Sequence, residues 1–205
     1  MFPLQLFLIG LPQNNMNLEE YLGKTSKKHL VFDFDLTLVE LFIEWQIVKE
    51  KIHKYFAALD PVLAAECEDL GYAGYNKMIK KYGPEVKKTV DELYLEAETD
   101  KNREVTLNKE ALNFIAVNQN KYTFYIWSNN QRQTVDEILK ENNLTKYFKT
   151  VVTASDVKLF KPDIKGFYRI YIKGQNKKEY LMIGDSDNDR KSAENSGIDY
   201  FYLRI

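Results

Sequence analysis

Cysteine is almost absent from this sequence, in which Cys67 is the one cysteine among 205 residues. A lone cysteine excludes an internal disulfide, and the lack of disulfides is typical of proteins in a reducing compartment. We therefore expect a cytoplasmic protein. A chain of this length is long enough to bury a substantial hydrophobic core without covalent crosslinks.

An excess of charge of either sign is also missing, because 29 lysines and arginines oppose 30 aspartates and glutamates, for a net charge of -1. This balance gives no general electrostatic reason to expect a nucleic acid or an anionic membrane as a partner. The apolar stretch from Phe2 to Leu11 is too short to cross a bilayer. It lacks the basic flank and cleavage site of a signal peptide, so we expect an extra strand or a segment docked on the core.

What is present is an ordinary globular composition, with 44% apolar and 29% charged residues. The length fits one large domain, or a core with a smaller unit. Residues 1–28 form an amino-terminal extension in this interpretation. We expect residues 29–40 and 105–205 to form a core, and residues 41–104 to form a small helical domain inserted into it. His29, just before the first core strand, is expected to be solvated.

The stretch from Leu30 to Thr37 combines a buried strand with two acids. Its apolar residues end at Asp33 and Asp35, which lie two positions apart and would share one side of extended backbone. Acids that close repel each other unless a cation, a shared proton or a basic residue lies between them. The alternative is a strand that ends in an Asx turn, with Thr37 capping the segment that follows.

After Thr37 the apolar spacing becomes helical, with residues three or four apart at Leu41, Trp45, Val48, Ile52, Tyr55 and Leu59. Asp60 and Pro61 predict the end of one helix and the start of the next. Gly71 and Gly74 are expected to break a helix, and we find no convincing strand between residues 41 and 104. The aromatic residues here are expected to pack in the core of this domain: Trp45, Tyr55, Phe56, Tyr72, Tyr75, Tyr82 and Tyr94.

From residue 105 onward, predicted helices and strands alternate. Helices are expected at 107–118, 131–141, from 161–163 to about 173, and 190–195; strands are expected at 122–127, 150–153, 180–183 and 200–203. This order is typical of an α/β fold with a doubly wound parallel sheet.

Polar residues follow several of these strands. Ser128 follows one, Asp185 and Asp189 follow another, and Lys161 lies between them in the chain. The carboxyl ends of parallel strands meet at one edge of the sheet, so these side chains should converge with Asp33 and Asp35. Carboxylates gathered in one crevice favour a hard divalent cation, most naturally Mg²⁺. Ser128 and the backbone N–H groups that begin the next helix could hold phosphate oxygens.

In their order, these residues resemble the four motifs of the haloacid-dehalogenase-like (HAD) superfamily of phosphohydrolases. The motifs are Asp33-Phe-Asp35-Leu-Thr37, Ser128 after an apolar strand, Lys161 before proline, and Gly184-Asp185 with Asp189. The resemblance covers residues 31–203 and implies a Rossmann-like core. The helical insertion is similar to the cap of the phosphoglycolate-phosphatase-like branch. Leu36 departs from that branch, where many members have glycine.

The resemblance implies a role for each matching residue. Asp33 would be the nucleophile that becomes an aspartyl-phosphate, and Asp35 the acid and then the base. Mg²⁺ would be held by the Asp33 carboxylate, the Asp35 carbonyl and Asp185, while Asp189 would support the metal or Lys161. The substrate would be bound by Thr37, Ser128, Asn129 and Lys161.

The sequence therefore predicts a Mg²⁺-dependent phosphatase that hydrolyses a small phosphorylated metabolite. Asp35 argues against dehalogenation, because the dehalogenases of the family have no second aspartate in this motif. Two alternatives remain open: a phosphomutase or phosphotransferase on the same core, and a non-catalytic interaction module. Asp187 is expected to be a solvated residue at a helix start. The cap is expected to supply specificity, but its sequence predicts neither the substrate nor the oligomeric state.

Overall fold

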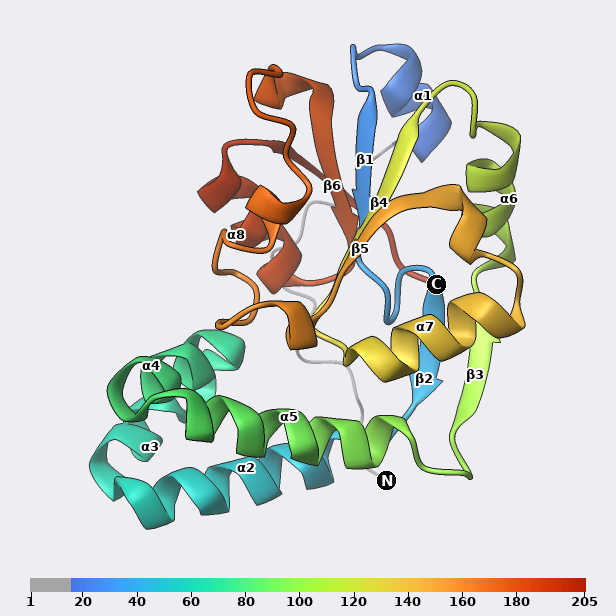
Figure 1. The fold of residues 1–205 in the computed structure, drawn as a ribbon. Coiled ribbons are helices and arrows are strands. Elements are labelled where there is room, and N and C mark those ends of the chain that lie inside the picture. Colours follow the sequence, from blue (N-terminus) through green and yellow to red (C-terminus); the bar gives the residue numbers. More distant parts are fainter. Residues whose placement is uncertain (1–15) are drawn as a thin grey trace.

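The computed structural model describes residues 16–205, so the expectation for Phe2–Leu11 lies outside the described residues. The core is a sheet of five parallel strands in the order β5-β4-β1-β6-β7 (Figure 1). The strands are β1 (His29–Phe32), β4 (Thr123–Trp127), β5 (Phe148–Val152), β6 (Tyr180–Gly184) and β7 (Asp199–Tyr202). The predicted α/β fold with a doubly wound parallel sheet is confirmed.

Successive residues of the central strand enter two separate hydrophobic clusters, because side chains alternate across a strand. Leu30 and Phe32 pack on one face, and Val31 packs on the other. The first face is covered by α1 (Leu18–Gly23), α6 (Lys109–Val117) and α7 (Arg132–Glu141). The second is covered by α8 (Asp187–Ser196) and the segment around the 3₁₀ turn Phe167–Arg169.

The strand order reverses at β1. After β1 the chain adds β4 and β5 on one side, then returns to add β6 and β7 on the other. Such a switch point opens a crevice at the carboxyl ends of the strands, where ligands bind in open α/β sheets. Asp33 follows β1 directly, and its backbone N–H donates to the carbonyl of Ile183 on β6 at 2.8 Å.

The inserted domain is a bundle of α2 (Trp45–Leu59), α3 (Pro61–Cys67), α4 (Tyr72–Tyr82) and α5 (Pro84–Glu98), below the sheet in Figure 1. Asp60 caps α3, and its carboxylate accepts from Leu63 N at 3.0 Å. The expectation that Gly74 breaks a helix is wrong, since it lies inside α4. A Cβ at Gly74 would come 2.6 Å from the carbonyl oxygen of Cys67, so this glycine permits α4 to pack closely on α3.

The expectation of no strand between residues 41 and 104 is also wrong. Strand β2 (Val39–Phe42) pairs antiparallel with β3 (Glu104–Leu107), and the two form a ribbon that joins the bundle to the core. Leu41 fits the helical spacing of the residues after it, but it belongs to β2, where it pairs with Val105. Each strand has four residues and its partner lies far away in the sequence, so local periodicity did not indicate the pairing.

Besides the ribbon, the bundle is attached to the core by a buried interface. Their apolar side chains form one cluster that includes Phe160 of the core. Asn76 on α4 forms two hydrogen bonds of 2.9 Å with the backbone N–H and carbonyl of Phe160. Lys87 donates to the carbonyl of Ala154 at 3.0 Å. Glu98, at the end of α5, accepts from Gln131 N at 2.9 Å.

Two local expectations for the core are corrected. The helix expected from residues 161–163 to about 173 is reduced to the turn Phe167–Arg169, and Gly166 fits so closely on Trp127 that a Cβ would lie 2.1 Å from the indole Nε1. His29 is buried rather than solvated; its ring stacks on Tyr180 with centroids 4.4 Å apart. Burial lowers the pKa of this histidine.

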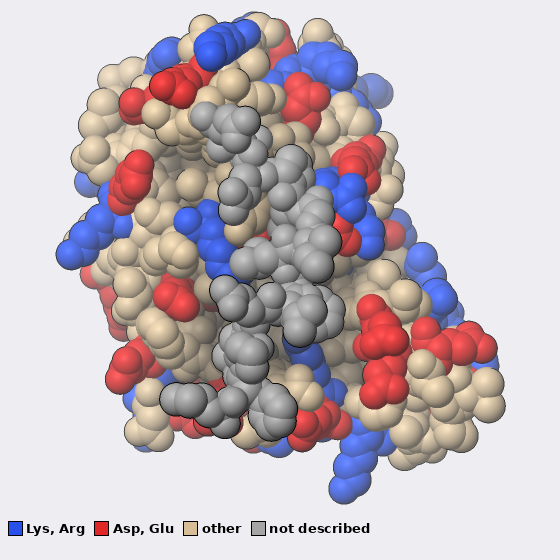
Figure 2. All heavy atoms as spheres, turned by 180° about the vertical axis from the view of Figure 1, so that it is seen from behind, with Lys and Arg blue, Asp and Glu red and all other residues tan. Residues whose placement is uncertain are grey.

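On the face shown in Figure 2, positive and negative side chains are intermixed, in agreement with the nearly balanced net charge. Within residues 16–205, none of the helices has both the length and the apolar character that a bilayer crossing requires.

Candidate active site

A cavity of about 280 Å³ lies between the carboxyl edge of the sheet and the inserted bundle. Its core wall comes from the segments that follow β1, β4, β5 and β6, and includes Asp33, Asp35, Ser128, Asn129, Lys161 and Asp185. The tertiary structure therefore brings together residues from all four motifs, as their positions at strand ends predicted.

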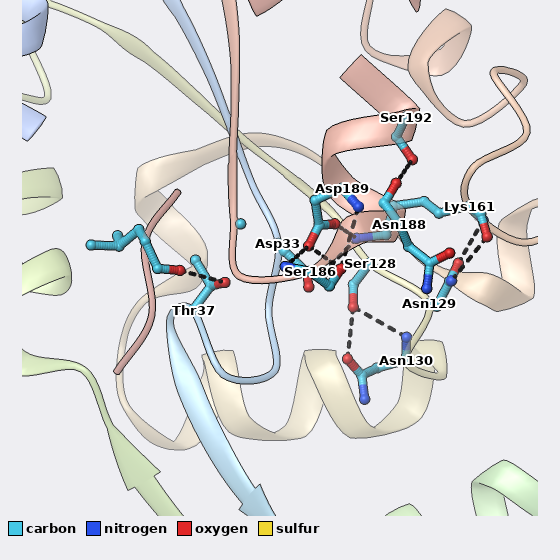
Figure 3. Close-up of polar contacts among 12 residues, drawn as sticks. Asp33, Thr37, Ser128, Asn129, Asn130, Lys161, Ser186, Asn188, Asp189 and Ser192 are labelled. Carbon is cyan, nitrogen blue, oxygen red and sulfur yellow. Dashed lines mark hydrogen bonds and ion pairs between the residues drawn. The ribbon is translucent and has the colours of Figure 1, made fainter. Parts of the chain in front are cut away.

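Lys161 is held between two acids at the centre of this wall. Its Nζ lies 2.7 Å from Asp33 Oδ1 and 2.5 Å from Asp189 Oδ1, and the side chain is 2% exposed (Figure 3). Burial by itself would lower the pKa of this lysine, but Asp189 and Asp33 outweigh burial and raise it. Lys161 therefore stays positively charged and offsets part of the charge of the acids.

The acids carry more negative charge than Lys161 can neutralise. Burial raises the pKa of Asp33 to about 6, with a further contribution from Asp189 and opposition from Lys161. Burial, together with Asp33 and Asp189, raises the pKa of Asp185 to about 8. The carboxylate ions are thus destabilised here, and an added cation would relieve their repulsion.

The donor atoms fit a hard divalent cation. One oxygen each from Asp33, Asp185 and Asp189 lies within 4.8 Å of the others, and all three residues are buried. Oxygen ligands of this kind suit Mg²⁺. Asp189 already accepts hydrogen bonds at both oxygens, from Lys161 on one and from Ser186 on the other. It is thereby better placed to support the site than to contribute a free ligand atom.

Asp35 lies in a sharp turn after Asp33. Its Oδ1 accepts from Leu41 N at 2.9 Å, and burial raises the pKa of its carboxyl to about 7. Leu36, the next residue, has a φ of 59°. This left-handed conformation strains most side chains and favours glycine, the residue that many members of the phosphoglycolate-phosphatase-like branch have here.

The loop after β4 contributes polar side chains to the same cavity wall as Asp33. Asn129 Oδ1 accepts from Lys161 N at 2.7 Å, which connects this loop to the lysine. Ser128 donates to Asn130 at 2.7 Å. Where α7 begins, the N–H groups of Gln131 and Arg132 already have acceptors, Glu98 and Ser155. The side chains of this loop therefore remain better candidates for phosphate binding than the helix start.

Thr37 of the first motif and Asp187, which lies between Asp185 and Asp189, are both away from the cavity. Thr37 is fully buried with its hydroxyl 3.5 Å from the carbonyl of Leu203, and Figure 3 shows it apart from Lys161 and Asp189. This placement argues against the expected contact between Thr37 and substrate. Asp187 pairs on α8 with Arg190 and with Lys191, consistent with the solvated position expected for it.

The cap wall of the cavity was not foreseen. Trp45, Lys49, Tyr72 and Tyr94 line it, although the aromatic residues were expected only to pack in the core of the domain. They do also pack, with the Tyr72 and Tyr94 rings 5.8 Å apart. The one available signal was that Trp45 and Lys49 lie one helical turn apart soon after Asp33 and Asp35, and therefore share a face.

Comparison with known proteins shows the family of this chain. Residues 30–203 match the family model of haloacid dehalogenase-like hydrolases. No curated protein sequence matches the chain.

Several solved structures share the fold. A predicted phosphoglycolate phosphatase from Haemophilus somnus 129PT is 18% identical, with 88% of this chain and 89% of that chain covered and a TM-score of 0.54. The HAD hydrolase YfnB from Bacillus subtilis, solved with magnesium, is 18% identical, with 85% of each chain covered and a TM-score of 0.50. The L-2-haloacid dehalogenase of Xanthobacter autotrophicus is 16% identical, with 85% and 76% covered and a TM-score of 0.55. At these identities the structures establish the fold alone.

The family match spans most of the chain and includes every motif that forms the cavity wall. The chain belongs to the haloacid dehalogenase-like hydrolases.

Proposed function

We propose that this hydrolase is a Mg²⁺-dependent phosphatase that acts on a small phosphorylated metabolite through an aspartyl-phosphate. The observation that carries the proposal is the arrangement of Asp33 at the switch point of the sheet, 2.7 Å from buried Lys161 and beside further acids. The size of the cavity, about 280 Å³, favours a metabolite over a phosphoprotein.

In the first step, Asp33 attacks phosphorus. Its Oδ1 is held by Lys161, which leaves the other carboxylate oxygen to form the new bond. The bond from phosphorus to the leaving oxygen breaks, and Asp35 donates a proton to that oxygen. A carboxyl pKa of about 7 is suited to this role, because the group is protonated in a substantial fraction of molecules near neutral pH.

In the second step, Asp35 acts as the base. It takes a proton from water, whose oxygen attacks phosphorus and displaces the Asp33 carboxylate. Free phosphate leaves, and both aspartates return to their starting states. Lys161, Ser128 and Asn129 hold the oxygens of the phosphoryl group and offset its charge.

Asp33 and Asp185 would hold the cation together with the carbonyl of Asp35, and Asp189 would support them through Lys161 and Ser186. The bound Mg²⁺ would supply positive charge that reduces the repulsion between a carboxylate nucleophile and a phosphate dianion. Asp35 also separates this proposal from dehalogenation, which needs no acid for a leaving alcohol.

A panel of phosphorylated metabolites, incubated with the purified protein and Mg²⁺, tests the proposal through the release of free phosphate. We expect release that stops on chelation and resumes when Mg²⁺ is restored. An isomerised sugar phosphate without free phosphate would instead indicate a phosphomutase. Turnover that survives exhaustive chelation would contradict the proposed site.

A further inference from the structure

Lys49 lies on the cap side of the active-site cavity. It lies on α2, it is exposed, and it lines the cavity. The residues one turn away on either side, Trp45, Gln46, Ile52 and His53, carry no carboxylate. No ion pair of Lys49 is formed within residues 16–205. Other lysines of the same bundle do pair with acids, namely Lys51, Lys81 and Lys87.

The remainder of the cap wall is aromatic and uncharged. Trp45 and Tyr94 have ring centroids 5.8 Å apart, and Tyr72 stacks on Tyr94. Burial raises the pKa of both tyrosines, so their hydroxyls stay neutral. Of the cap residues that line this cavity in the described chain, Lys49 is therefore the one that carries a charge.

The core wall has no positive charge to spare for a second anionic group. Lys161 is bonded to both Asp33 and Asp189. The cavity beside Asp33 is bounded by the core on one side and by the cap on the other, so the leaving group of a phosphoryl group at Asp33 has its space toward the cap. The leaving group then meets the aromatic side chains and Lys49.

We propose that Lys49 binds a second anionic group on the leaving group, so that the preferred substrates are small phosphomonoesters that also carry a carboxylate or another phosphate. This inference rests on the proposed phosphatase function and identifies the substrate class. A hydrogen bond from a lysine ammonium to an anion is about twice as strong as one between neutral groups.

Two phosphate esters of nearly equal size provide the test. 3-Phosphoglycerate and glycerol 3-phosphate differ in that a carboxylate replaces a hydroxymethyl group, and p-nitrophenyl phosphate reports on the chemistry itself. We expect the parent to favour 3-phosphoglycerate. Lys49→Ala should lower kcat/KM for this substrate by about tenfold or more, mainly through KM, and should leave the other two substrates within about threefold.

Two variants serve as controls. Lys49→Arg keeps the charge and should keep most of the preference. Lys54→Ala removes an exposed lysine from the same helix that does not line the cavity, and should match the parent.

Equal losses on all three substrates would show that Lys49 acts on the phosphoryl group alone, and would overturn the inference. So would a parent that does not distinguish the two glycerol-based esters. In both cases hydrolysis of p-nitrophenyl phosphate would leave the phosphatase proposal standing, whereas a parent that hydrolyses no ester with Mg²⁺ would overturn both.

Discussion

Asn76 connects the cap to Phe160, the residue before Lys161, and its replacement has a calculable cost. The side chain is 6% exposed, and it both accepts from Phe160 N and donates to Phe160 O at 2.9 Å. In Asn76→Ala the carbonyl of Phe160 keeps a second donor, Asp163 N at 2.9 Å, but the N–H of Phe160 loses its acceptor. One unpaired buried N–H and one lost hydrogen bond together cost about 2–4 kcal/mol in the free energy of unfolding.

The same change should reduce catalysis, because Phe160 precedes Lys161. The backbone N–H of Lys161 is fixed by Asn129, and its Nζ by Asp33 and Asp189. When the backbone at Phe160 loosens, the lysine and the nucleophile are less well positioned. We expect kcat to fall by roughly 10-fold to 100-fold, as is typical of small displacements in a catalytic site.

Urea unfolding with Mg²⁺, followed by far-ultraviolet circular dichroism, measures the first effect, and phosphate release measures the second. Lys77→Ala is the matched control, because Lys77 is the exposed neighbour of Asn76 on α4. We expect this control to stay within about 0.5 kcal/mol of the parent. The reasoning is refuted if Asn76→Ala unfolds at the same urea concentration as the parent, or if Lys77→Ala shows an equal loss.

Four further predictions follow from the site. Asp33→Asn should reduce turnover by at least about a thousandfold, or about 4 kcal/mol in the barrier, because an amide is a poor nucleophile. The control Asp187→Asn, which changes an acid outside the cavity, should retain activity. Parent-like activity in purified Asp33→Asn would exclude the mechanism. Mg²⁺ should raise the thermal unfolding midpoint of the parent by binding the folded chain, and Asp185→Asn should lose most of this shift; an equal shift in both proteins would place the cation elsewhere. Leu36→Gly should relieve the strain of a φ of 59° and stabilise the fold by about 0.5–1 kcal/mol, less any lost side-chain packing. If the variant unfolds at a clearly lower urea concentration than the parent, this expectation is wrong. Burial raises the pKa of Glu98 from its usual 4.5 to about 7. Between these two pH values the folded chain therefore binds more protons than the unfolded chain. As a result, the free energy of unfolding falls as the pH rises from 4.5 to about 7. Glu98→Gln should make this fall shallower when unfolding is measured with Mg²⁺ from about pH 5 to pH 7, and identical slopes would show that Glu98 does not titrate in this range.

Local chemistry in the sequence was sufficient to predict the sheet and the core wall of the cavity. Strands β1, β4 and β6 are mostly apolar, and the polar residues that follow them lie at the same edge because parallel strands share a direction. Asp33, Lys161 and Asp185 could therefore be assigned to one site before their distances were known. The start of α3 at Asp60 could likewise be predicted, since helix caps depend on residues a few positions apart.

Other features depend on partners far away in the chain, which periodicity does not reveal. The ribbon of β2 and β3 joins segments separated by the whole cap, so Leu41 was assigned to a helix. Thr37 belongs to the motif by sequence but packs beside Leu203. His29 is polar, yet it is buried because Tyr180 lies over its ring.

The contribution of the cap to the active site was decided only by the tertiary structure. Helical spacing correctly indicated that Trp45 and Tyr94 are packed, but their packing leaves one side of each open to the cavity. Nothing local to Lys49 distinguishes it from other exposed lysines of the bundle. It lines the same cavity as Asp33 and Asp185 because the ribbon and the Asn76 hydrogen bonds hold the bundle against the carboxyl edge of the sheet. Short-range order in the sequence is enough to bring Asp33, Asp35 and Asp185 to one edge of the sheet, whereas the cap residues that line the cavity depend on how the inserted bundle packs against the core.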